Sequence, residues 1–228
     1  MTIRKRVGVL ISGRGSNLAS LIQASRDPGY PAEIVLVFSN KADAYGLVRA
    51  KEADIPTRVI SHKSFPSREE FDAAITSALK EARVDLVCNA GFMRLHSASF
   101  VREWSGRQLN IHPSLLPAFR GLHPQARALE AGVRVSGATV HFVSEEMDAG
   151  PIIAQGAAPV LPDDDEDALS ARILTMEHRL YPLALKLVAS GAAWLENDRV
   201  KFASSHLSTS LWPHYEDADE SHRFLLPG

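Results

Sequence analysis

The segment NIHPSLLPAF, residues 110–119, carries two side chains that could act together in a reaction. Asn110 and His112 stand two positions apart at the end of an apolar run, and side chains two apart in a strand project to the same face. Asn110 can donate an amide hydrogen bond to a carbonyl oxygen, and His112 can take and return a proton near neutral pH. Pro113 and Pro117 stop the chain from continuing as strand or helix. The pair is therefore predicted to sit on a rigid strand end.

A carboxylate that could assist His112 follows in HFVSEEMDAGPII, where Asp148 falls in a loop ahead of a strand and Gly150-Pro151 fixes the backbone behind it. A carboxylate beside a histidine raises the imidazole pKa and holds the ring in place. Taken singly, each of the three residues is more often structural, the Asn and Asp as turn formers and the His as a satisfied core residue.

Other chemistries lack support in the sequence. No serine, cysteine or lysine stands in an obvious nucleophile context, and Cys88 in VDLVCNAGF is expected to be a buried core residue. The histidines at 96, 112, 123 and 141 lack a recognisable zinc spacing. Metal-free transfer between two bound substrates is the chemistry that remains.

The first loop, within VGVLISGRGSNLASLI, has the order strand, glycine turn, helix that aims free N–H groups at an anion. Gly13 and Gly15 allow close backbone approach, while Ser16 and Asn17 could cap the helix or bind phosphate oxygens. Leu18 stands where a dinucleotide fingerprint needs its third glycine, and no P-loop lysine follows. A single phosphate fits this loop better, although a plain helix cap explains the same residues.

The elements that must position these residues alternate along the chain as short β-branched runs and longer amphipathic stretches. This alternation predicts an α/β fold with a Rossmann-like open, mostly parallel sheet and helices on both faces. Strands are expected at residues 7–12, 33–39, 57–60, 85–90, 108–112, 136–143, 151–160 and 200–202, and helices at 17–24, 43–53, 68–82, 124–131 and 165–189. In such a sheet the loops after Ser12, Ala90 and His112 open on one edge, where ligands bind.

The C-terminal half is expected to differ from the first half. Strands 136–143 and 151–160 alternate more in polarity and are predicted to be antiparallel edge strands, with Thr139, His141 and Val143 on one face. The acidic run 163–167 is interpreted as the start of a helix rather than a metal site. A domain spanning residues 1–203 is expected, followed by a loosely packed tail at 204–228.

Composition excludes several classes of partner. Lys and Arg number 25 against 27 Asp and Glu, which gives a net charge of −2 and no general attraction to nucleic acid or to an anionic membrane. No run of about 18 apolar residues indicates a transmembrane helix. A single cysteine and the lack of a signal-peptide pattern favour a cytoplasmic location.

Five motifs in order, SGRGSNL, AGFMRL, NIHPSLLPAFRGLHPQ, HFVSEEMDAGPII and EHRLYP, closely resemble the phosphoribosylglycinamide formyltransferase family, the folate-dependent transformylases of purine synthesis. The resemblance spans roughly residues 6–201. It implies transfer of a formyl group from 10-formyltetrahydrofolate, a co-substrate, to the amine of 5′-phosphoribosylglycinamide (GAR) in IMP biosynthesis. No metal is implied, and the enzyme would be a monomer or homodimer.

The same resemblance assigns roles to individual residues. Asn110, His112 and Asp148 would be catalytic, with Asn110 on the formyl oxygen and His112, kept cationic by Asp148, assisting there and in proton transfer. The phosphate and ribose of GAR would bind Gly15, Ser16, Asn17 and Glu177. The folate would bind Arg68, Met93, Arg94, Leu95, His96, Asn110, Ser144, Glu145, Glu146, Met147 and Asp148. His96, where a leucine is common, and Gln125, where a second histidine is frequent, depart from the family pattern.

Three alternatives remain. Formyltetrahydrofolate deformylase uses water in place of the amine and carries a regulatory domain before this core, whereas here the first strand is expected at about Arg6. Methionyl-tRNA formyltransferase carries an extra basic C-terminal domain, whereas this chain, which ends at Gly228, has the acidic segment EDADE near its end and lacks a basic patch. A non-catalytic binder of a phosphorylated metabolite would explain the first loop, but would give Asn110, His112 and Asp148 no reason to converge.

Overall fold

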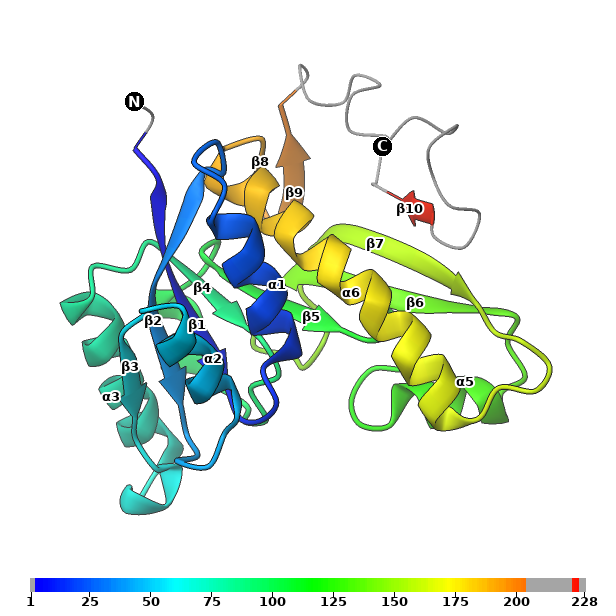
Figure 1. Cartoon of the computed structure of the whole chain (residues 1–228), viewed down its shortest axis with the longest axis horizontal. Helices are drawn as coiled ribbons and strands as arrows, with labels where there is room; N and C mark the ends of the chain where they lie inside the picture. Colours follow the sequence, from blue (N-terminus) through cyan, green and yellow to red (C-terminus); the bar gives the residue numbers. More distant parts are fainter. Residues whose placement is uncertain (1–2, 204–222, 226–228) are drawn as a thin grey trace. The chain divides into compact units, whose positions relative to one another are not determined.

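The computed structural model describes residues 3–203 and the backbone of 223–225 (Figure 1). The chain divides into two compact units, Met1–Asn110 and Ile111–Gly228. The predicted tail, residues 204–228, lies outside the described residues apart from a short strand at 223–225.

The first unit is a parallel sheet with connecting helices, as the alternation in the sequence predicts. Its elements are β1 (Lys5–Ile11), α1 (Ser16–Ser25), β2 (Ala32–Ser39), α2 (Gly46–Glu52), β3 (Thr57–Val59), the 3-10 helix η1 (His62–Ser64), α3 (Arg68–Glu81), β4 (Leu86–Asn89), α4 (Ala98–Glu103) and β5 (Gln108–His112), which runs into the second unit. The strand order is β5-β4-β1-β2-β3, and every neighbouring pair is parallel. The mostly parallel sheet is confirmed.

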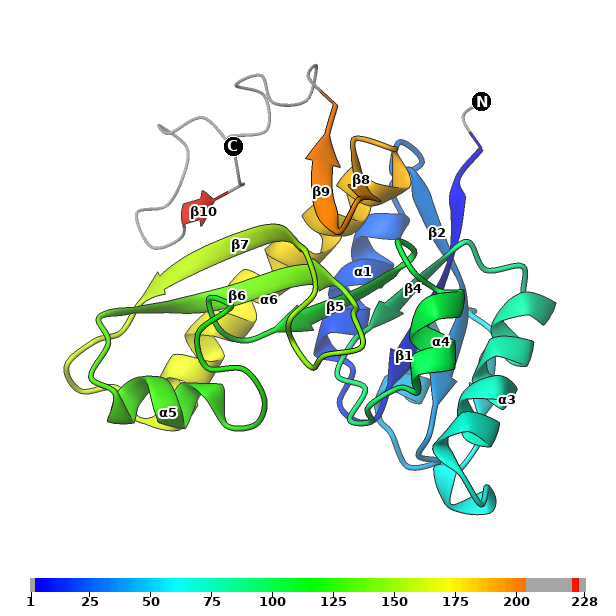
Figure 2. The same cartoon turned by 180° about the vertical axis from the view of Figure 1, so that it is seen from behind.

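Helices cover both faces of this sheet. In Figure 1, α1 and α2 lie in front of the strands, and Figure 2 shows α3 and α4 on the opposite face. Large apolar side chains from the strands, α3 and α4 form one core between them: Leu10, Leu36, Phe38, Phe71, Ile75, Leu79, Val87, Phe100 and Trp104. Cys88 in β4 is fully buried, as expected.

Local sequence explains where these helices begin. Ser67 caps α3 by accepting a hydrogen bond from Glu70 N at 3.2 Å, and the buried residues of α3 recur at helical spacing. Helix α2 begins three residues later than predicted, and its first residue, Gly46, donates its N–H to Gly13 O at 3.0 Å. Helix α4 was not predicted from the sequence, because it spans six residues and is too short to show a helical period.

The second unit is antiparallel in its strands. Its elements are α5 (Pro124–Glu130), β6 (Val135–Phe142), β7 (Ile152–Pro159), α6 (Glu166–Ala189), β8 (Ala193–Glu196), β9 (Arg199–Phe202) and β10 (Arg223–Leu225). β6 pairs with β7 and β7 with β10, both antiparallel, as expected for the C-terminal half. Helix α6 packs on β6 and β7. All of β6 except Val135 is buried, so its polar Thr139 and His141 lie in the interior rather than on a solvated face.

Only one strand of the β8–β9 hairpin was predicted from the sequence. The predicted strand at residues 200–202 corresponds to β9, while β8 was not expected. The two strands are joined by Asn197 and Asp198, which have φ values of 50° and 58°. Two consecutive residues of this type with positive φ form the turn that tight hairpins favour. The Asn-Asp dipeptide was therefore the feature of the sequence that could have predicted the hairpin.

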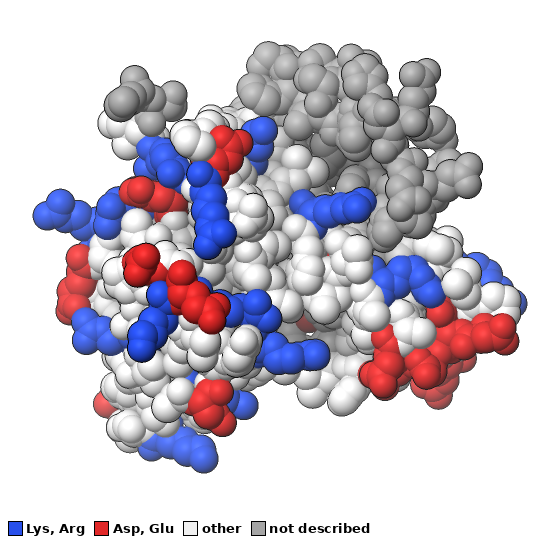
Figure 3. Space-filling view, in the orientation of Figure 1, with Lys and Arg blue, Asp and Glu red and all other residues white. Residues whose placement is uncertain are grey.

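The acidic run lies at the N-terminus of α6, as interpreted from the sequence. Asp165 caps the helix by accepting from Ala168 N at 2.8 Å, and Asp164 pairs with Arg172 at 2.6 Å. Elsewhere on the face drawn in Figure 3, cationic and anionic side chains are interspersed. Among the described residues, no helix combines the length and apolarity that crossing a membrane requires.

Candidate active site

His112 and Asp148, 36 positions apart in sequence, meet in the second unit. His112 is the last residue of β5, and Asp148 lies in the loop between β6 and β7. The His112 Nδ1 and Asp148 Oδ2 atoms are 3.3 Å apart, and the two side chains are 8% and 11% exposed. Gly121 N also donates to Asp148 Oδ2 at 2.9 Å, so the carboxylate is fixed from a second side. This contact is the one that the sequence reasoning expected.

The second nitrogen of His112 also faces an acceptor. His112 Nε2 lies 3.0 Å from the carbonyl oxygen of Phe119. A carbonyl and a carboxylate can only accept, so both contacts are hydrogen bonds only when the ring carries a proton on each nitrogen. Each ring nitrogen of His112 therefore lies near a group that can only accept a hydrogen bond.

A second histidine, His141 in β6, lies on the other side of the same carboxylate. Its Nε2 is 3.9 Å from Asp148 Oδ1, and its Nδ1 is 2.9 Å from Phe142 O. Burial lowers the pKa of His141, although the Phe142 carbonyl and Asp148 act in the opposite direction. His141 is therefore neutral at pH 7 and donates from Nδ1. In the sequence, His141 has no zinc spacing and is expected only as part of an alternating strand face.

The backbone around Asp148 is shaped for this contact. Asp148 has a φ of 51°, and two residues later a Cβ on Gly150 would lie 1.8 Å from Phe142 O. Only glycine can occupy position 150 without displacing β6, so the loop is forced to return close to that strand. The turn-forming residues DAGP therefore place the Asp148 carboxylate next to β6.

Asn110 precedes His112 by two positions in β5, and its side chain is half-buried. Strand alternation places the two side chains on the same face. The predicted residues of the loop before Asp148 are half-buried or exposed: Ser144 is half-buried, and Glu145, Glu146 and Met147 are exposed. Arg120 pairs with Glu146 at 2.7 Å and so ties the segment after β5 to the loop that carries Asp148.

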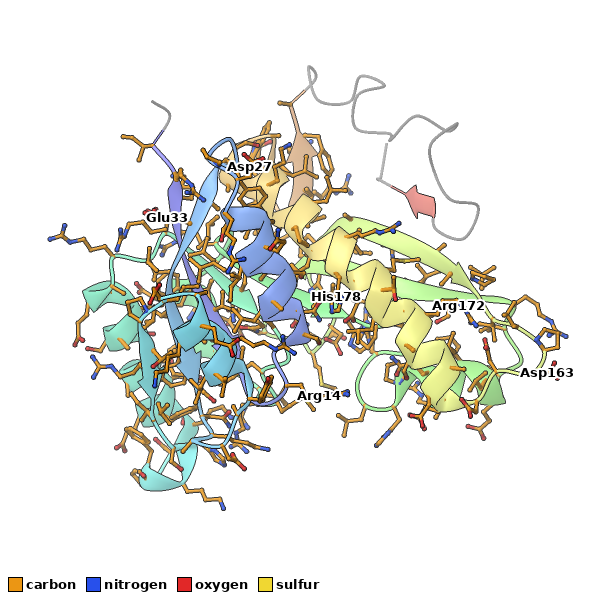
Figure 4. The ribbon with its side chains drawn as sticks, viewed as in Figure 1. Arg14, Asp27, Glu33, Asp163, Arg172 and His178 are labelled. Carbon is orange, nitrogen blue, oxygen red and sulfur yellow. The ribbon has the colours of Figure 1, made fainter. Side chains whose placement is uncertain are left out.

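The predicted anion loop lies at the start of α1 in the first unit. Gly15 precedes the helix with φ 67° and ψ 35°, and no side chain caps the helix N-terminus. A Cβ on Gly15 would lie 2.7 Å from the Cα of Gly46, so both the φ value and the close approach require glycine. Arg14 is exposed beside this turn (Figure 4). Free N–H groups and a neighbouring guanidinium are features of an anion site.

The loops after β1 and β4 lie side by side. Ser12 N donates to Gly91 O at 3.1 Å, and the Ser12 hydroxyl accepts from Met93 N at 2.8 Å while donating to Asn40 Oδ1 at 2.7 Å. The structure therefore brings the anion loop and the segment 92–96 to one edge of the parallel sheet. Sequence reasoning expected these loops to share an edge, but not the serine that joins them.

The other predicted residues are distributed as follows. Arg68 is exposed at the first position of α3, Met93 and Leu95 are 65% and 55% exposed, and Arg94 is also exposed. The pKa of His62 is lowered, first by burial and then by the charges of Arg94, Lys63 and Lys41. The surroundings of His62 are therefore positively charged. His96, predicted to bind folate, has a side chain only 3% exposed. In the second unit, Glu177 is buried in α6, beside His178 (Figure 4).

Comparison with known proteins decides the family. A family model described as formyl transferase matches residues 5–185. The chain belongs to the formyl transferase family. It is 60% identical over 192 residues to the trifunctional purine biosynthetic protein adenosine-3 of Drosophila melanogaster, an alignment that covers 83% of this chain and 14% of that protein. The chain thus spans about a seventh of the length of that relative.

Shorter members of the formyl transferase family match over nearly their whole length. The phosphoribosylglycinamide formyltransferase of Haemophilus influenzae is 45% identical over 85% of this chain and 92% of its own. The crystal structure of glycinamide ribonucleotide transformylase 1 from Symbiobacterium toebii superposes with a TM-score of 0.85 at 48% identity, covering 87% and 94% of the two chains. A formyltetrahydrofolate deformylase from Pseudomonas syringae superposes with a TM-score of 0.81 at 26% identity, and only 66% of that chain is covered.

Proposed function

We propose that this chain transfers the formyl group of 10-formyltetrahydrofolate to the amine of 5′-phosphoribosylglycinamide, giving formyl-GAR and tetrahydrofolate in purine biosynthesis. The observation that carries the proposal is the His112–Asp148 contact at the end of the strand that also presents Asn110. Family membership and the near full-length match to proteins named for this activity support it.

The chemistry follows from what each side chain can donate. The amine nitrogen attacks the formyl carbon, and the carbonyl oxygen becomes an oxyanion that the Asn110 amide and the His112 cation stabilise. Collapse of this intermediate breaks the bond to the folate nitrogen. That nitrogen takes up a proton as the amine loses one, and His112 passes the proton between them. Asp148 holds the ring in its orientation throughout.

The substrate-binding residues are assigned through the resemblance to the family. The phosphate of GAR binds at Gly15, Ser16 and Asn17, and its ribose hydroxyls at Glu177. The folate contacts the segment Met93 to Leu95 and the loop Ser144 to Asp148, with Arg68 nearby. The helix N-terminus at Gly15 and the exposed side chains of Met93 and Leu95 support these assignments.

The decisive experiment is an absorbance assay with purified protein and 10-formyltetrahydrofolate, run with and without GAR. We expect turnover that requires GAR. Turnover with water alone would assign the chain to the deformylases, and turnover only with aminoacylated tRNA would assign it to the tRNA formyltransferases. Binding of GAR without any turnover would leave a non-catalytic binder. The lower identity to the deformylase favours the transferase over the first of these rivals.

The setting of this activity is also part of the proposal. A single formyltransferase domain spans residues 1–203, with 204–228 as a tail, and the family match at residues 5–185 supports that span. The protein acts in the cytoplasm as a monomer or homodimer, without a metal. Sedimentation velocity across a range of protein concentrations distinguishes the two oligomeric states.

A further inference from the structure

The segment Phe92–His96 has an exposed middle and two fixed ends. Met93 and Leu95 are 65% and 55% exposed, and Arg94 between them is also exposed. At the first end, Met93 N donates to the Ser12 hydroxyl at 2.8 Å. Exposed apolar side chains on a short loop keep one arrangement only if both ends are held.

At the second end, one buried carboxylate holds two groups. Asp72 of α3 contacts His96 Nδ1 through Oδ1 at 3.2 Å and accepts from Ser97 N through Oδ2 at 2.5 Å. The side chains of His96 and Asp72 are each 3% exposed. Ser97 is also the residue that caps α4. Asp72 therefore fixes the end of the segment and the start of the next helix together.

Aromatic rings hold His96 from both faces. The Phe100 ring stacks on it at 4.1 Å with planes 8° apart, and the Phe92 ring at 5.2 Å with planes 15° apart. His96 Nε2 is buried with no hydrogen-bond partner among the described residues. The tautomer with its proton on Nδ1 leaves only a lone pair at Nε2, which costs less than a buried unpaired N–H.

This arrangement does more than fill the core, because a buried carboxylate is costly unless it is paired with hydrogen-bonding groups. We propose that Asp72 and His96 are positioning residues that fix the segment 92–96 and thereby set the affinity for the formyl donor. The proposal rests on the proposed function. His96 acts through the backbone of its own segment, since its buried ring leaves Met93, Arg94 and Leu95 to face the ligand.

Two substitutions separate the hydrogen bond from the stack. His96→Asn places an amide nitrogen where Nδ1 stands and keeps the bond to Asp72 without the ring. His96→Phe keeps the stack and loses the bond. For His96→Phe we expect the KM for 10-formyltetrahydrofolate to rise about tenfold, as loss of a hydrogen bond to a charged group predicts. The kcat and the KM for GAR should stay close to wild type, and His96→Asn should recover most of the donor KM.

The matched control is Glu103→Gln, which removes the exposed Lys80–Glu103 ion pair at 2.7 Å between the same two helices and should change none of these constants. A lower urea midpoint for His96→Phe with a wild-type donor KM would overturn the proposal, because the pair would then be purely structural. Equal donor KM values for the two His96 variants would overturn it as well.

A binding measurement separates this proposal from the proposed function. Isothermal titration calorimetry with tetrahydrofolate needs no turnover, and His96→Phe should weaken binding about tenfold whereas His96→Asn should not. If wild-type protein binds tetrahydrofolate but does not formylate GAR, the proposed function fails while the positioning role stands or falls on the two variants. If wild-type protein does not bind tetrahydrofolate, the positioning role fails.

Discussion

At the scale of single residues, neighbours decide what each histidine can do. His112 has an acceptor at each ring nitrogen. His141 is buried more deeply, and burial lowers its pKa. Asp148 lies 3.3 Å from His112 Nδ1 and 3.9 Å from His141 Nε2, so one carboxylate contacts two imidazoles in different surroundings.

The role of His112 predicts a selective loss of turnover. His112→Ala should lower kcat by about 10²–10⁴-fold, the usual contribution of a general acid–base group. The KM for GAR should change little, because the proposed phosphate site is the loop at Gly15. Steady-state kinetics with both substrates measures this, and Asp163→Asn, an exposed change in the same unit, is the control. A His112→Ala protein with wild-type kcat contradicts the mechanism.

The lowered pKa of His141 predicts a pH dependence of stability. The unfolded chain binds a proton at this ring below its ordinary pKa of 6.5, while the folded protein resists it, so wild-type stability falls as the pH drops below that value. His141→Asn keeps a donor for Phe142 O but does not titrate. As the pH drops, the free energy of unfolding of this variant should fall less steeply than that of wild type. The two slopes should differ by up to about 1.4 kcal/mol per pH unit.

Urea unfolding at pH 7.5, 6.5 and 5.5 provides that comparison. His123→Asn, a change at an exposed histidine in the same unit, is the control and should retain the wild-type slope. If His141→Asn and wild type had parallel profiles, the pKa of His141 would be the same in the folded and unfolded chain, and the lowered pKa would be wrong.

At the scale of elements, the turns before α1 and α2 restrict the choice of residue more than the helices themselves do. Gly15 combines a left-handed backbone with close contact to Gly46, and Gly46 in turn bonds to the carbonyl of Gly13. These contacts join the start of α1 to the start of α2 and determine where both helices begin. The anion loop is therefore a shared feature of two helices.

Gly15→Ala tests this shared constraint against a matched glycine. Gly132 has nearly the same φ, 66°, but open space around its Cβ position, so Gly132→Ala carries only backbone strain of about 1–2 kcal/mol. Gly15→Ala adds the clash with Gly46, worth roughly a further 1–3 kcal/mol, and should raise the KM for GAR. Urea denaturation gives both stabilities, and equal costs for the two variants would disprove the close approach.

The Asp164–Arg172 ion pair at the N-terminus of α6 leads us to expect a second pH dependence of stability. A hydrogen bond from Arg172 lowers the pKa of Asp164 to about 2 from its ordinary 3.8. The stabilisation is therefore complete above the ordinary value and is lost as the pH falls through about 2. Asp164→Asn should be less stable than wild type at pH 7, and the difference should shrink between pH 4 and pH 2. Thermal unfolding between pH 7 and pH 2 measures this difference in stability. The control Asp163→Asn is expected to differ from wild type equally at every pH.

At the scale of the whole molecule, ligand binding should stabilise the folded chain. If GAR binds the folded protein alone, a concentration of 100 Kd raises the free energy of unfolding by about 2.7 kcal/mol. Urea unfolding with and without GAR measures the effect. The riboside that lacks the phosphate is the control and should stabilise far less if the helix N-terminus at Gly15 is the phosphate site. Equal stabilisation by the two compounds would contradict a phosphate site.

Sequence alone determined the features that depend on local order. The alternation of strands and helices, the glycine turn before α1, the spacing of Asn110 and His112, and the resemblance to formyltransferases all follow from residues close together in the chain. Strand and helix periods and turn preferences act over a few residues, so they can be read without a structure.

The tertiary structure decided which distant groups meet. Phe119 O at His112, His141 beside Asp148, and the bonds from Asp72 to His96 and Ser97 depend on how loops pack and exclude water. The sequence gives no spacing rule for such contacts, because the cost of burying a polar group is offset only by partners that folding brings near. The candidate site residues could therefore be proposed from the sequence by type and position, whereas the groups that surround them depended on packing.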